Sequence, residues 1–132
     1  MYRSIHTPGA IVKVLMTGYE HYAIVSDRIH NGLPMLISLS RRTGTVLEEA
    51  WEACTGGRKV VLSEDQGRLA PYQVLAQARS MIGRVEWDFP RLTCEHFARW
   101  THGLKVESKQ LKTAVGLIAA ITMFMLIFRK CV

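Results

Sequence analysis

The stretch LTCEHFARW, Leu92 to Trp100, places a cysteine where the sequence predicts the beginning of a helix. Thr93 is suited to the N-cap position, and Phe97 supplies apolar surface one turn later. Cys94 then falls in the first turn, where the positive end of the helix dipole is expected to stabilise a thiolate. A free cysteine has a pKa of about 8.5, so it needs such a helix end, or an imidazole partner, to act as a nucleophile near neutral pH.

An imidazole partner occurs earlier in the chain, in the segment GYEHYAIV. His21 opens an apolar stretch that is predicted to be a strand, and only the fold can bring it to Cys94. His96 is closer in sequence, but helical residues two positions apart point about 200° apart. We therefore expect His96 to make a structural hydrogen bond and His21 to be the base. Cys54 has no adjacent base in the sequence and is predicted to be inert.

The first half of the chain has the pattern of a small antiparallel sheet. Residues 10–16 and 21–26 are rich in β-branched and apolar side chains, and the turn between them contains Gly18. Three shorter segments are predicted to add strands: 35–39, after a turn at 31–34, then 45–47 and 59–62. For the fourth of the five strands the alternative is a helical turn over 47–53.

The second half of the chain is predicted to be helical. From Pro71 to Ile82 the apolar residues recur at helical spacing, and Gly83 is suited to cap the C-terminal end. Together with the helix that begins after Thr93, this gives an α+β fold class, a small antiparallel sheet packed with helices. Residues 1–104 are long enough to form one compact domain of the usual size.

Four segments, GYEHYAIV, ISLSRRTG, GGRKVVL and LTCEHFARW, follow one another between residues 8 and 104. Their order and content resemble the bacterial and phage branch of the lecithin:retinol acyltransferase family. That family belongs to the wider NlpC-type group of cysteine enzymes. The resemblance implies a circularly permuted papain-like fold, in which the histidine precedes the cysteine in sequence.

The resemblance also implies a cysteine–histidine acyl transfer enzyme. Cys94 would attack an ester or amide carbonyl and form a thioester, with His21 as general base and then acid. The family usually has asparagine where this chain has Thr93, and its third polar residue, often a histidine, aligns here with Ser38 in LISLS. His30 is the alternative for that third position, since only a polar group able to bond the far ring nitrogen is needed.

No metal or other cofactor is expected at these residues. The four candidate ligands show neither paired CxxC nor HxxxH spacing; they are Cys94, His96, His21 and His30. The three cysteines of the chain are widely spaced, and Lys13 interrupts the N-terminal apolar stretch before a secretory signal could form. We therefore expect free thiols in a reducing cytoplasm.

The C-terminal segment TAVGLIAAITMFMLIF, residues 113–128, is uncharged. As a helix it would span about 24 Å, somewhat less than the hydrocarbon core of about 30 Å. Basic residues flank it on both sides, as they do at lipid head groups. We therefore predict a basic linker over 105–112, a membrane-anchoring helix over 113–128 and a short basic tail over 129–132, with the domain facing the cytoplasm. The alternative is an apolar helix buried in a homo-oligomer.

The formal net charge of +6 would by itself fit either a nucleic acid or an anionic lipid as partner. No basic motif interleaved with aromatic residues appears, so a phospholipid membrane is favoured and no nucleic acid is expected. A domain tethered to the bilayer meets lipid at high effective concentration. Acyl esters of glycerophospholipids are therefore the predicted substrates, by hydrolysis or transacylation. Two alternatives stay open: an NlpC-type amidase or peptidase, and an inactive membrane-tethered binding module of phage or host-defence type.

Overall fold

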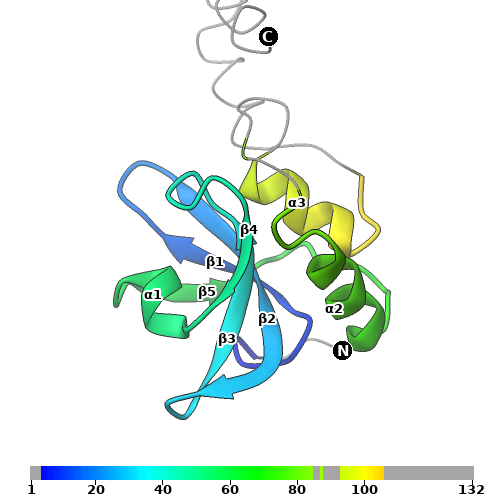
Figure 1. Ribbon diagram of the computed structural model, residues 1–132, viewed down its shortest axis with the longest axis horizontal. Coiled ribbons are helices and arrows are strands. Elements are labelled where there is room, and N and C mark those ends of the chain that lie inside the picture. Colours follow the sequence, from blue (N-terminus) through cyan, green and yellow to red (C-terminus); the bar gives the residue numbers. More distant parts are fainter. Residues whose placement is uncertain (1–3, 85–86, 88–92, 106–132) are drawn as a thin grey trace, which may run out of the picture.

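The computed structural model describes residues 4–84, 87 and 93–105 (Figure 1). The strands of this part form one antiparallel sheet in the order β4-β3-β2-β1-β5. They are β1 (Ile11–Leu15), β2 (Glu20–His30), β3 (Leu33–Leu39), β4 (Val46–Glu49) and β5 (Val60–Leu62). The helices are α1 (Trp51–Thr55), α2 (Pro71–Ser80) and α3 (Cys94–Thr101). The predicted α+β class with a small antiparallel sheet is confirmed.

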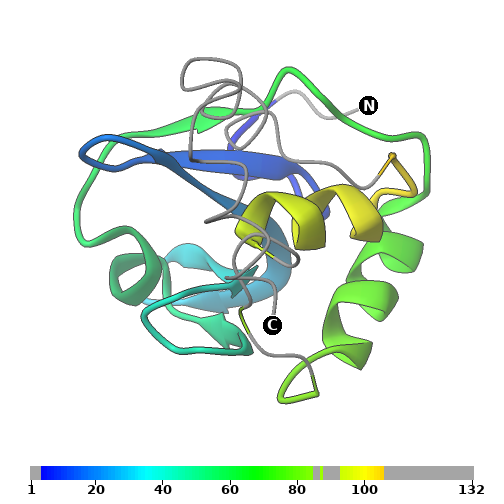
Figure 2. The same cartoon turned by 90° about the horizontal axis from the view of Figure 1, so that it is seen from above.

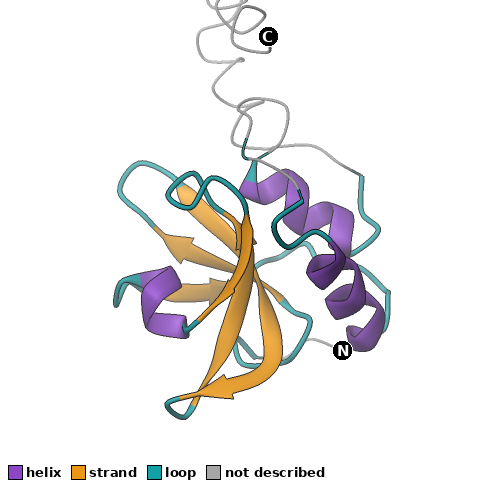
Figure 3. Cartoon of the chain, in the orientation of Figure 1, coloured by secondary structure: helices purple, strands orange, loops and turns teal. Residues whose placement is uncertain are grey.

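Helices cover both faces of the sheet. Figures 2 and 3 show α2 and α3 together on one face, with α1 on the opposite face. Side chains alternate along β2, so Tyr22 and Ile24 join the core under α2 and α3, whereas Ala23 and Val25 join a second core under α1. Because this part of β2 is buried on both sides, its sequence is a continuous apolar run rather than an alternating one.

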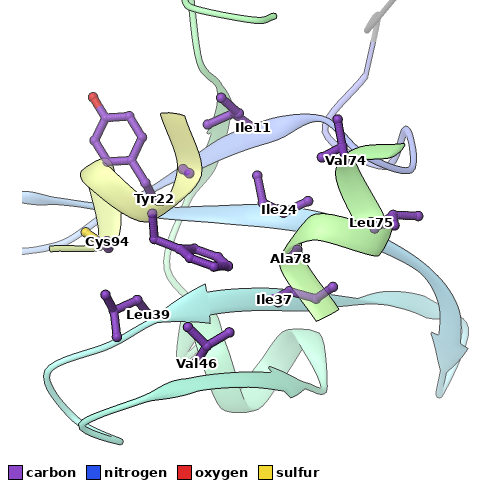
Figure 4. Close-up of a cluster of buried hydrophobic side chains, with 12 residues drawn as sticks. Ile11, Tyr22, Ile24, Ile37, Leu39, Val46, Val74, Leu75, Ala78 and Cys94 are labelled. Atoms are coloured by element: carbon purple, nitrogen blue, oxygen red, sulfur yellow. The ribbon is translucent and has the colours of Figure 1, made fainter. Parts of the chain in front are cut away.

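The larger core, drawn in Figure 4, joins the two long helices to the middle of the sheet. Phe97 of α3 and Leu75 of α2 contribute to the same buried cluster as Ile24 and Ile37 of the central strands. Complete burial of such side chains stabilises the fold by about 1.5–3 kcal/mol each. This packing holds the first turn of α3 against β2.

The β2–β3 hairpin is tighter than the predicted turn over 31–34. Asn31 has a φ of 52° and Gly32 a φ of 80°, which is the positive pair that a two-residue type I′ turn requires. Pro34 therefore already lies in β3, where it pairs with Ile29. The strand β2 extends to His30, four residues beyond its predicted end, because its last residues are exposed and do not show the apolar pattern of the buried half.

The segment that follows β3 contains both of the structures between which the sequence left a choice. Residues 46–49 form β4 and residues 51–55 form α1, which ends at Gly56 in the left-handed conformation, φ 60°. Helix α2 ends at Ser80 with Met81 as its C-cap, so the predicted cap at Gly83 is wrong. Gly83 instead donates its N–H to the carbonyl oxygen of Val46, at 3.2 Å.

Gly67 passes so close to the end of α3 that a side chain has no room there. An added Cβ would lie 2.2 Å from the carbonyl oxygen of His102 and 2.8 Å from its Cβ. The Gly67 N–H also donates to Nδ1 of His102, at 2.8 Å, and Nε2 of His102 lies 2.6 Å from the carbonyl oxygen of Gly9. The imidazole of His102 thus links the loop before α2 to the segment before β1.

We expect Gly67→Ala to lower the free energy of unfolding by about 2–3 kcal/mol, because the methyl group forces two backbone segments apart. Urea denaturation followed by circular dichroism measures this loss. Gly57→Ala is a suitable control, since an added Cβ at Gly57 meets no atom within 4 Å and only its φ of 76° opposes the substitution. A loss for Gly67→Ala no larger than that of the control would contradict the steric argument.

The predicted linker beyond Lys105, the membrane-anchoring helix over 113–128 and the tail over 129–132 lie outside the described residues. Across residues 4–84 and 93–105, no helix combines the length and the apolar character needed to cross a bilayer.

Candidate active site

Cys94 is the first residue of α3, as predicted from the sequence. Thr93 occupies the N-cap position in an extended conformation, φ −118° and ψ 177°. Its backbone N–H donates to Nδ1 of His96, at 3.0 Å, which is the structural hydrogen bond expected of that histidine. The cap fixes the direction in which the Cys94 side chain leaves the helix.

The Cys94 thiol lies against the backbone of β2. Its Sγ is 3.9 Å from the carbonyl oxygen of Glu20, and the residue is 8% exposed. Burial raises the pKa of the thiol to about 11, although a hydrogen bond with the backbone of Tyr22 acts in the opposite direction. The free protein therefore holds Cys94 as a thiol at pH 7, and not as the thiolate expected from the helix dipole.

His21 lies near the start of β2, and Ser38 reaches it from β3. Nε2 of His21 is 3.0 Å from Oγ of Ser38, and both side chains are buried. Burial, together with the positive charge of Arg42, lowers the pKa of His21 to about 4. The imidazole is therefore neutral at pH 7. Its Nδ1 makes no hydrogen bond with any described residue.

His30 does not take part in this cluster. It is exposed and lies at the opposite end of β2, nine residues from His21. At the rise of an extended strand nine residues span up to about 30 Å, so the two histidines lie far apart. Of the two candidates for the third position, the structure brings Ser38 to the ring of His21 and leaves His30 at the tip of the hairpin.

The Cys94 thiol lies on one face of β2, next to the position of His21, and the His21 side chain leaves the strand on the opposite face. The residue whose carbonyl contacts the thiol, Glu20, directly precedes His21 in the chain. Cys94 packs in the core that contains Tyr22 (Figure 4), whereas His21, one position earlier on the strand, points toward the side of α1. In the part of the chain that the structure describes, no hydrogen bond joins the two side chains.

A second thiol lies on the other side of Ser38. Oγ of Ser38 is 3.8 Å from Sγ of Cys54, which projects from α1 toward the sheet. Burial raises the pKa of Cys54 to about 11, so this thiol is protonated as well. No sequence pattern near Cys54 indicates this contact, because nothing local predicts that α1 folds back over β3.

These residues provide a buried thiol, a neutral imidazole and a hydroxyl that binds the imidazole. No family model and no curated protein matches this chain significantly. Among the described residues, no group of three or more His, Cys, Asp or Glu side chains is placed to hold a metal ion. Sulfur is the potential nucleophile of this set and the imidazole its potential base, but the Cys94 and His21 side chains lie on opposite faces of β2 and no hydrogen bond joins them among the described residues.

The buried His21 makes the folded state sensitive to acid. Its pKa is about 4 in the folded protein and near 6.5 in an unfolded chain, so the unfolded chain binds more protons between these values. The stabilisation is fully present above pH 6.5 and is lost as the pH falls toward 4, by on the order of 3 kcal/mol. Burial lowers the pKa of His96 and His102 too, so both act in the same direction.

Urea denaturation between pH 7 and pH 4 measures this dependence. His21→Gln keeps a hydrogen-bonding side chain beside Ser38 but cannot titrate, so the slope of stability against pH should become shallower in this variant. An unchanged slope would show that His21 does not titrate differently in the folded and unfolded states.

Proposed function

We propose that this chain is a thiol acyltransferase or hydrolase of lipid acyl esters, with Cys94 as the nucleophile and His21 as the general base. The observation that carries the proposal is the position of the Cys94 thiol, in the first turn of α3 and against the backbone that leads into His21. The contact of Ser38 with Nε2 of His21 supports it, because this contact occupies Nε2 and leaves Nδ1 without a hydrogen-bond partner among the described residues.

In the finer classification, we propose that the α+β domain is a permuted papain-like fold of the lecithin:retinol acyltransferase type. The histidine lies on a strand, the cysteine opens a later helix, and that helix packs on the strand. This arrangement agrees with the order of residues that the resemblance implies.

The reaction begins with both groups neutral. Sγ of Cys94 attacks the ester carbonyl carbon, and the thiol proton moves to Nδ1 of His21 as the C–S bond forms. Because the two side chains leave the strand on opposite faces, this transfer requires one of them to move toward the other. The ester C–O bond then breaks, and the imidazolium returns this proton to the departing alcohol oxygen, which leaves a thioester on Cys94. The backbone N–H groups in the first turn of α3 lie at the positive end of the helix and are suited to stabilise the negative charge that develops on the carbonyl oxygen.

The second half of the reaction releases the acyl group. Water, or an alcohol or amine in a transfer reaction, gives a proton to His21 as it attacks the thioester carbonyl. The C–S bond breaks, the imidazolium returns the proton to Sγ, and the free acid, ester or amide leaves. Because burial raises the pKa of Cys94, the thiolate forms during attack rather than before it.

A lipid substrate follows from the part of the chain beyond α3. The uncharged segment over 113–128, with basic residues on both sides, is the proposed single-pass anchor, and it would hold the domain at the cytoplasmic face of a phospholipid membrane. The net charge of +6 favours an anionic lipid surface. Association of this segment with a second copy of the chain is the alternative.

The test is intact mass spectrometry of the detergent-solubilised full chain after incubation with phosphatidylcholine vesicles. We expect a fatty-acyl mass increment on the wild type that maps to Cys94, and none on Cys94→Ala or His21→Ala. An increment obtained only with amide substrates would move the assignment to an amidase or peptidase. A native protein without an adduct from either class would overturn the proposed activity.

A second candidate function is a membrane-tethered binding module without catalysis. The observation that favours it is the state of the resting site, in which Cys94 is buried and protonated and makes no hydrogen bond with His21. This candidate expects vesicle binding by the full chain with no acyl adduct, and the same experiment separates it from the enzyme.

A further inference from the structure

A chain of hydrogen-bonding groups runs from His21 to α1 along the face of the sheet that α1 covers. It runs from Nε2 of His21 to Oγ of Ser38, at 3.0 Å, and from there to Sγ of Cys54, at 3.8 Å. All three side chains are at least nine-tenths buried, so water does not compete freely for these contacts. The three groups come from different elements, β2, β3 and α1.

The direction of the hydrogen bonds in this chain decides which ring nitrogen of His21 carries the hydrogen. A neutral imidazole has one N–H donor and one bare acceptor nitrogen. If Nε2 carries the hydrogen, it donates to Oγ of Ser38, and Nδ1 is bare. If Ser38 donates to Nε2 instead, Nδ1 carries the hydrogen and cannot accept a proton from Cys94.

The Ser38 hydroxyl has a single hydrogen to give, and two acceptors are within its reach, the sulfur of Cys54 and a bare Nε2 of His21. Within the described chain, Ser38 Oγ makes side-chain hydrogen bonds with only His21 and Cys54. When the hydroxyl donates to sulfur, its lone pairs are turned toward Nε2 of His21. A thiol is a weak donor and a weak acceptor, whereas an imidazole N–H is a good donor to a hydroxyl oxygen.

We propose that Cys54 is a positioning residue: by accepting the hydrogen bond of Ser38 it keeps the hydrogen of His21 on Nε2 and leaves Nδ1 bare, as the proton acceptor that the proposed reaction requires. The contribution of Cys54 to catalysis rests on the proposed function. Its effect on the tautomer of His21 can be measured in the protein without any substrate. Cys54 itself forms no bond to substrate. Helix α1 holds it over Ser38, where the buried Trp51 anchors the helix in the core under that face.

The test is ¹⁵N NMR of the imidazole nitrogens in the full chain, solubilised in detergent micelles at pH 7, with the His21 signals assigned through His21→Gln. We expect the Nε2–H form in the wild type and a shift toward the Nδ1–H form in Cys54→Ala and Cys54→Val. Cys54→Val fills the space of the thiol without an acceptor, so it remains informative if the alanine variant fails to fold. Cys54→Ser restores an acceptor and should restore the Nε2–H form.

Val12→Ala is the matched control, because it truncates a buried side chain in the same core without touching Ser38. It should leave the tautomer as in the wild type. In acyl-enzyme formation we expect a roughly 10- to 100-fold lower kcat with unchanged KM for Cys54→Val, the usual cost of losing a partner that orients a functional side chain.

An Nε2–H form that persists in both Cys54→Ala and Cys54→Val would overturn the proposal, whatever happens to the activity. A shifted tautomer in a protein that forms no acyl adduct even as wild type would support the role of Cys54 in orienting His21, and would reject the proposed acyl transfer. The two failures are therefore distinguishable.

Discussion

Cys94→Ser should abolish both the acyl adduct and the release of fatty acid from phospholipid vesicles, with kcat/KM reduced by at least about 10³-fold. A serine hydroxyl is a far weaker acid than a thiol, and the buried His21, with a pKa near 4, is a weak base. The imidazole is therefore poorly matched to removing a proton from serine. The substitution changes a single atom in the first turn of α3, so the capping contact between Thr93 and His96 should persist.

The control for this variant is Cys131→Ser, which alters a thiol near the C-terminus and should retain the parental rate. Far-UV circular dichroism and the urea midpoint establish whether Cys94→Ser is folded. A folded Cys94→Ser variant that releases fatty acid as fast as the wild type would remove Cys94 from the mechanism.

Arg79→Ala should cost about 3–5 kcal/mol of stability, the largest loss that we expect from a single ion pair in the described chain. Arg79 binds both carboxylate oxygens of Glu48, at 3.2 and 3.0 Å, and also contacts Ser26 and Asp27. The Glu48 side chain is only 5% exposed. Removal of Arg79 leaves that carboxylate with one cationic partner among the described residues, the exposed Arg28.

The pH dependence of Arg79→Ala gives a second readout. Burial by itself would raise the pKa of Glu48, but the hydrogen bonds from Arg79 and Ser26 outweigh it and hold the pKa below its usual value. In the wild type the Arg79–Glu48 pair therefore stabilises the fold at pH values above the ordinary pKa of a carboxyl group. This stabilisation is lost as the pH falls below about 4.5. Without Arg79, burial still raises the pKa of Glu48 but its main opposing hydrogen bonds are gone. The loss of stability that Glu48 causes at low pH should therefore become smaller or change sign.

The matched control is Arg42→Ala, which breaks the pair of Arg42 with Glu49, at 2.6 Å. The Arg42 side chain is 56% exposed, so this loss should stay within about 1 kcal/mol. Urea denaturation at pH 7 compares the two variants. A cost for Arg79→Ala as small as that of Arg42→Ala would show that the attachment of α2 to the sheet does not depend on this network.

The strands and helices could be predicted where local patterns repeat. The apolar run in β1, the helical spacing in α2 and the N-cap before Cys94 each occupy a short stretch, and the structure confirms all three. The predicted ends of the strands were wrong where the strand residues are exposed and do not show an apolar pattern. The second half of β2 and the early start of β3 at Leu33 depend on pairing between strands rather than on their own composition.

The candidate site was only partly accessible to sequence reasoning. The alignment of Ser38 with the third polar position led to a residue that lies 3.0 Å from His21. Cys54 was missed, because its contact with Ser38 requires α1 to fold back on the sheet. The expectation of a thiolate failed for a related reason, since the helix end is visible in the sequence whereas the burial around the thiol is not.

The sequence by itself determined the antiparallel sheet, the two long helices and the place of Cys94 in the first turn of α3, because periodicity and capping act over a few residues. Only the tertiary structure decided the ionisation of Cys94 and His21, the partner of Nε2 of His21 and the face of β2 on which each of the two side chains lies. Desolvation depends on every segment that covers a group, and one position along a strand reverses the direction of a side chain, so both are properties of the packed chain rather than of any local stretch.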